Sequence, residues 1–76
     1  MSKRVVVWAP NYTAEADDFS YLWEEPDRRS AGIRLYNAHV RYTDGREEIL
    51  HQLDVHLRPD SGISWGYVEV RGDEEG

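Results

Sequence analysis

The stretch Gly32-Ile-Arg-Leu-Tyr-Asn-Ala-His-Val-Arg-Tyr-Thr-Asp-Gly-Arg-Glu-Glu-Ile-Leu-His-Gln-Leu-Asp-Val-His-Leu-Arg58 decides the fold of this 76-residue chain. Two runs of strand-forming residues stand on either side of Asp44-Gly45, a pair that favours a β-hairpin turn because glycine tolerates positive φ. A second turn, Pro59–Gly62, leads into a further strand-like run that ends at Arg71. The pattern therefore predicts an antiparallel meander from Gly32 to Arg71, with Gly45 at positive φ.

The register of the hairpin depends on the length of its loop. A two-residue loop, Asp44-Gly45, places Thr43 opposite Arg46 and gathers apolar side chains on one face: Tyr36, Ala38, Val40, Ile49 and Leu53. A three-residue loop, with Gly45 in a bulge, shifts the pairing by one residue and mixes the two faces, although it pairs Ile33 with Val55. We favour the two-residue loop because it separates apolar from polar side chains better.

The residues before the meander predict one strand and one helix. Arg4–Trp8 is a short apolar run without alternation, which is typical of a central strand. In Tyr12–Asp27, helical spacing aligns one stripe, namely Tyr12, Ala16, Phe19, Leu22 and Trp23, with Thr13 as the N-cap.

The predicted fold is therefore α+β in the order β-α-β-β-β, a small antiparallel sheet with one short helix packed on one face. The alternative is an almost all-β small barrel or sandwich in which Tyr12–Trp23 is a loop.

The final strand raises the question of which face joins the core. Alternation places Trp65 and Tyr67 on one face and Val68 and Val70 on the other. We expect the valines to join the main core. Trp65 and Tyr67 are then either covered by the helix in a second small core or open as an aromatic patch, and we favour coverage by the helix.

Length and composition limit the classes of protein. Residues 1–72 are expected to form one small domain, followed by a flexible acidic tail at 73–76. The chain has no cysteine, which is consistent with a reducing cytoplasm, where we expect the protein. No apolar run approaches the roughly 20 residues of a membrane-spanning helix. The net charge of −6 disfavours direct binding to nucleic acid, whose phosphates require basic side chains.

The sequence offers little support for catalysis or for cofactors. In the favoured register His39 and His51 project from opposite faces, and His56 does not join either of them as a metal triad. No serine stands in a nucleophile motif, and no glycine-rich phosphate loop is present. We therefore expect neither a metal nor a cofactor, and we expect the protein not to be an enzyme.

Acidic residues interleaved with aromatic residues are the most distinctive feature, and they predict a protein-binding module. Such a surface would engage a basic partner, for example as an inhibitor or a nucleic-acid mimic. The candidate partner-binding residues are Asp17, Asp18, Tyr21, Trp23, Glu24, Glu25, Trp65 and Tyr67. The exposed edges of so small a sheet also leave room for a homodimer.

Two other functions remain open. One is a small enzyme or ligand-binding barrel that uses Arg34, His39, Arg41 or Tyr67. The other is a structural subunit of a larger assembly.

Overall fold

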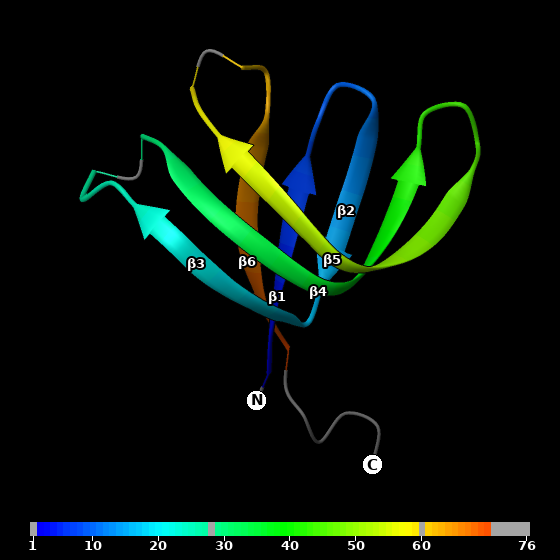
Figure 1. The fold of residues 1–76 in the computed structure, drawn as a ribbon, viewed down its shortest axis with the longest axis horizontal. Coiled ribbons are helices and arrows are strands. Elements are labelled where there is room, and N and C mark those ends of the chain that lie inside the picture. Colours follow the sequence, from blue (N-terminus) through cyan, green and yellow to red (C-terminus); the bar gives the residue numbers. More distant parts are fainter. Residues whose placement is uncertain (1, 28, 60, 71–76) are drawn as a thin grey trace.

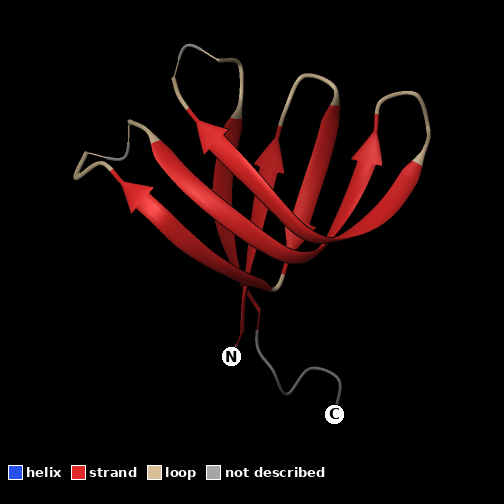
Figure 2. Ribbon diagram, viewed as in Figure 1, coloured by secondary structure: helices blue, strands red, loops and turns tan. Residues whose placement is uncertain are grey.

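The long strand β4 (Ala31–Tyr42) is the centre of the fold in the computed structural model (Figure 1). The structure describes residues 2–27, 29–59 and 61–70, and the side chains of 4–27, 29–59 and 61–66. The described residues form six strands and no helix (Figure 2): β1 (Ser2–Trp8), β2 (Tyr12–Ala16), β3 (Asp18–Glu24), β4, β5 (Glu47–Leu57) and β6 (Ser64–Val70). All pairings between these strands are antiparallel.

The sheet is built around the two edges of β4. β5 pairs along one edge, whereas β2 and β3 share the other. β1 then lies between β2 and β6, so the sheet runs β4-β2-β1-β6 on one side of the molecule. Strong bending of β4 and β5 curls this sheet into an open half-barrel (Figure 1).

A crease crosses the sheet at Asp17, Asn37 and His51. β2 and β3 follow one continuous register along β4, with Glu15 opposite His39 and Asp18 opposite Tyr36, so Asp17 stands beside Asn37. Asn37 has a φ of 52°, a left-handed conformation that asparagine adopts more readily than most residues. On the neighbouring strand His51 Nδ1 lies 3.3 Å from Asn37 Oδ1.

The crease changes which alternate residues face the interior. Before it, β4 buries Ile33 and Leu35; after it, β4 buries Ala38 and Val40. The same change separates Ala16 from Phe19 on the bent strand formed by β2 and β3. The concave face therefore holds a single core, made of Val5, Val7, Ala14, Ala16, Ala31, Ile33, Leu35, Ala38, Val40, Val55 and Leu57.

The predicted helix is wrong, because Tyr12–Glu24 forms β2 and β3. Its aromatic and β-branched residues are good strand formers. The helical stripe arose from the crease: the inward positions jump from Ala16 to Phe19, a step of three residues that imitates helical spacing. The predicted fold is thus corrected to an all-β curled antiparallel sheet, which resembles the barrel-like alternative except that Tyr12–Trp23 is not a loop.

The favoured hairpin register is also wrong. Tyr42 N donates to Arg46 O at 2.8 Å and Gly45 N donates to Tyr42 O at 3.0 Å, which makes a three-residue loop. Gly45 does hold positive φ, at 98°, as predicted. Ile33 pairs with Val55 and Leu35 with Leu53, and the expected core residue Ile49 is 69% exposed. The prediction failed because it assumed strict alternation through the crease.

The prediction for the last strand is corrected at Trp65. β1 is a central strand, as predicted, and pairs Val7 with Trp65 and Val5 with Tyr67. Paired residues share a face, so Trp65 joins the face of the buried Val7. Its ring meets Tyr21 at 6.0 Å between centroids, so a strand rather than a helix covers it. The expected tail at 73–76 lies outside the described residues.

Candidate functional site

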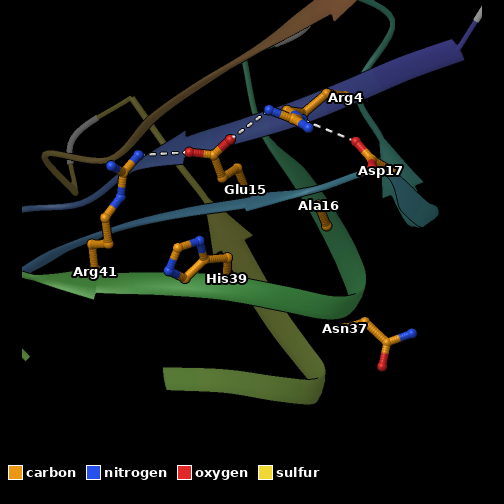
Figure 3. Close-up of a pocket in the computed structure, with 7 residues that line it drawn as sticks. All are labelled: Arg4, Glu15, Ala16, Asp17, Asn37, His39 and Arg41. Carbon is orange, nitrogen blue, oxygen red and sulfur yellow. Dashed lines mark hydrogen bonds and ion pairs between the residues drawn. The ribbon is translucent and has the colours of Figure 1, made fainter. Parts of the chain in front are cut away.

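A small hollow of about 260 Å³ lies on the outer face of the sheet beside the crease (Figure 3). Arg4 on β1 donates to Glu15 Oε1 at 3.0 Å and to Asp17 Oδ1 at 2.9 Å. Arg41 on β4 donates to the other oxygen of Glu15 at 2.7 Å. Figure 3 shows these side chains as a row that crosses β1, β2 and β4, whereas Asn37 points away from it.

The charges in this hollow already neutralise one another. The Glu15 side chain is only 19% exposed and lies between two guanidinium groups. The hydrogen bond and charge of Asp17 raise the pKa of Arg4, which keeps that cation firmly charged. His39 Nε2 lies 3.0 Å from Glu47 Oε1. The row is therefore a cross-strand ion-pair ladder, an arrangement that stabilises neighbouring strands.

The second arginine proposed for a ligand site is also paired. Arg34 donates through Nε and a terminal nitrogen to the two oxygens of Asp54, at 2.8 and 3.0 Å. This two-pronged bond lowers the pKa of Asp54 and raises that of Arg34. Each of Arg34, His39 and Arg41 thus faces a carboxylate, so no observation on these three residues favours a ligand-binding role.

The edge of β3 has a different character. In the described part of the chain β3 pairs with β4 only, so no described strand lies along its other edge. Leu22 and Trp23 on this strand are 49% and 42% exposed. Asp18 and Glu24, at the two ends of the strand, are exposed as well.

A bulge in β3 explains why Trp23 faces outward. The pairing of β3 with β4 shifts between Tyr21 and Trp23, which leaves Leu22 as the extra residue and sets Trp23 opposite Gly32. A Cβ at Gly32 would stand 2.8 Å from the indole nitrogen of Trp23. Only glycine lets the indole lie this close to the sheet. The indole then reaches His56 on β5, with ring centroids 5.1 Å apart.

The predicted partner-binding residues divide into three groups. Asp17, Asp18, Trp23, Glu24 and Glu25 are exposed along the β3 edge and its flanks. Tyr21, although it belongs to β3, and Trp65 have partly buried side chains that pack against the core, so these side chains do not form part of the exposed surface. The side chain of Tyr67 lies outside the described part.

Sequence reasoning missed two features of the outer face. The first is the exposure of Leu22, which the helical stripe had assigned to packing. The second is a hollow of about 610 Å³ at the end of β3, whose lining includes Trp23, His56, Arg58 and Asp27. A glycine inside a strand signals close approach of another group, so Gly32 was the available clue.

Three further findings concern metals, membranes and similarity. Among the described residues no three His, Asp or Glu side chains gather closely enough to hold a metal ion. The described residues include no helix that is long and apolar enough to cross a membrane. Comparison of the chain with protein families, curated proteins and solved structures gives no match.

Proposed function

We propose that the protein is a non-enzymatic binding module that docks a basic, extended segment of a partner protein along the free edge of β3. The observation that carries the proposal is the coincidence of three features on one short strand: an open edge, exposed apolar side chains and carboxylates at both ends. An added strand gains affinity from backbone hydrogen bonds and specificity from alternate side chains.

The apolar part of this surface is Leu22 and Trp23. Tryptophan is a favoured anchor of protein interfaces because it buries a large rigid surface. Here Gly32 and His56 support one side of the indole, which fixes its position before a partner arrives. A pre-positioned anchor loses less conformational entropy on binding.

The charged part of this surface selects a partner of opposite, positive charge. Tyr12–Asp27 contains six carboxylates and no basic residue. Asp17 and Asp27 are paired with Arg4 and Arg29, whereas no described cation lies within ion-pair distance of Asp18 or Glu25. The surface therefore suits lysine or arginine side chains at both ends of a docked strand, and a nucleic-acid-binding partner would have such a segment.

Titration of the ¹⁵N-labelled protein with a short synthetic peptide of alternating lysine and valine tests this proposal. We expect amide shifts to change along β3, and the changes to weaken as salt screens the exposed charges over a Debye length of about 8 Å at physiological ionic strength. A peptide of alternating glutamate and valine serves as the control and should leave β3 unchanged. Shift changes confined to another edge, or equal effects of the two peptides, would contradict the proposal.

A further inference from the structure

The longest free edge of the described sheet belongs to β5, whereas β3 and β6 each have a shorter one. β5 spans eleven residues, Glu47–Leu57, and in the described part of the chain it pairs with β4 only. Long edge strands are usually protected by charged side chains, above all lysine, by proline or by a bulge. β5 has no lysine or proline, and its carboxylates Glu47, Glu48 and Asp54 are bonded to side chains of β4, so its backbone can accept another strand.

Apolar side chains accompany this open edge. Ile49 is 69% exposed on the outer face, and Leu50 and Leu53 are only partly buried on the inner face. Both faces beside the edge therefore have apolar surface that an added strand would remove from water.

The charges along β5 point to one occupant. Glu47 and Glu48 stand at its beginning, after Arg46, whose charge is paired with Asp44, whereas His56 and the adjoining Arg58 stand at its end. Arg58 donates to His56 Nε2 at 3.2 Å, and no described carboxylate lies within ion-pair distance of it. When a second copy of β5 pairs in antiparallel orientation, the acidic beginning of each strand lies against the basic end of the other. The contact therefore forms twice.

From these observations we infer that β5 pairs with β5 of a second copy of this chain about a two-fold axis. The dimer continues the sheet across the axis and leaves both β3 edges free, so it is compatible with partner docking and does not depend on it. Because a two-fold contact uses the same patch on both copies, it closes and does not lead to fibres.

Single-cysteine variants test the pairing directly, since the natural chain has no cysteine. An axis through the middle of β5 brings residue 51 or 52 next to its own copy, within reach of a disulfide. Under mild oxidation we expect His51→Cys or Gln52→Cys to form a covalent dimer roughly tenfold faster than Thr43→Cys at the hairpin tip, because pairing raises the effective thiol concentration. Equal rates for all three variants would overturn the inference.

Charge reversal supplies an independent readout by sedimentation, over about 10 µM to 1 mM protein. Arg58→Glu should weaken association about tenfold, because the lost attraction counts twice in a two-fold contact. Adding Glu48→Arg to the Arg58→Glu variant should restore the association. A parent chain that stays monomeric throughout, or a double variant no better than Arg58→Glu, would refute the pairing. Both Arg58 and Glu48 are exposed, and Glu48→Arg removes only the surface hydrogen bond from the Tyr42 hydroxyl, so neither change threatens the fold.

Discussion

Asn37 is the residue on which the curl of the sheet depends. Asn37, with a φ of 52°, lies on β4 between Asp17 on one side and His51 of β5 on the other. The left-handed conformation costs roughly 1–2 kcal/mol for most L-residues, and more for β-branched ones.

We expect Asn37→Val to lower the free energy of unfolding by about 2 kcal/mol, because valine resists this φ. Asn37→Gly is the matched control and should stay within about 0.5 kcal/mol of the parent, because glycine accepts the conformation without strain. Urea denaturation of both variants measures the difference. Equal stability of Asn37→Val and Asn37→Gly would show that the residue is not held in the left-handed region.

Gly32 supports the exposed indole of Trp23 in a similar local way. A methyl group at Gly32 would meet the indole at 2.8 Å, so we expect Gly32→Ala to cost about 1–3 kcal/mol of stability. In a Trp23→Ala background the same change should cost less than about 0.5 kcal/mol, because nothing is left to displace. A cost that is unchanged in that background would mean that the indole does not lie over Gly32.

Features that depend on neighbouring residues in the sequence were predictable, whereas the crease was not. Positive φ at Gly45 follows from the Asp-Gly turn alone, and the central position of β1 follows from its apolar run. At Asn37 the set of alternate residues that faces the interior changes. This change involves Asp17 and His51, which become neighbours of Asn37 only after three strands have paired. Because the sequence does not show this change, alternation assigned Ile49 to the core, and the spacing of Ala16 and Phe19 imitated a helix.

At the scale of elements, β3 and β6 close the concave core through Tyr21 and Trp65. Their rings meet edge to face at 6.0 Å, although no β3–β6 pairing is present in the described sheet. The interior of the half-barrel is therefore covered by aromatic side chains from two strands that lie in different parts of the curl.

We expect Trp65→Ala to destabilise the protein by about 3 kcal/mol, because it removes a large, partly buried ring from the core. Trp8→Ala is the matched control, since Trp8 is 47% exposed, and it should cost clearly less. Thermal or urea denaturation of the two variants gives the comparison. A Trp65→Ala protein as stable as Trp8→Ala would contradict the packing of Trp65 inside the curl.

Free edges and acidity are properties of the whole molecule. In the described part of the chain the curl buries one continuous core without a covering helix, but it leaves β3, β5 and β6 each paired on one side only. The candidate site was predictable in its charge and in Trp23, because both are visible in the sequence. The open edge and the exposure of Leu22 were not, because a predicted helix offers no strand edge.

The free energy of unfolding of the whole domain should fall at low pH, and protonation of Asp54 should account for part of that fall. Hydrogen bonds from Arg34 lower the pKa of Asp54 in the folded protein. In the unfolded chain this carboxyl has its ordinary pKa of about 3.9, so it binds its proton there first. The pair's contribution is present above that pH and is lost as the pH falls through the lowered pKa of the folded state.

We therefore expect the denaturation midpoint of the parent to drop more steeply than that of Asp54→Asn between about pH 5 and pH 2. Asp18→Asn, which removes an exposed carboxylate outside any described ion pair, is the control and should follow the parent. Parallel curves for the parent and Asp54→Asn would count against the Arg34–Asp54 bond.

The most direct test of the docking proposal compares two matched charge reversals by calorimetry with the lysine–valine peptide. Glu24→Lys with Glu25→Lys and Glu47→Lys with Glu48→Lys change the net charge equally, but only the first pair lies beside the β3 edge. Docking on β3 predicts that the first variant weakens binding about tenfold or more, while the second changes it by less than about threefold. Equal weakening by both variants would mean that the net charge alone attracts the peptide. That result would contradict the β3 edge as the binding surface.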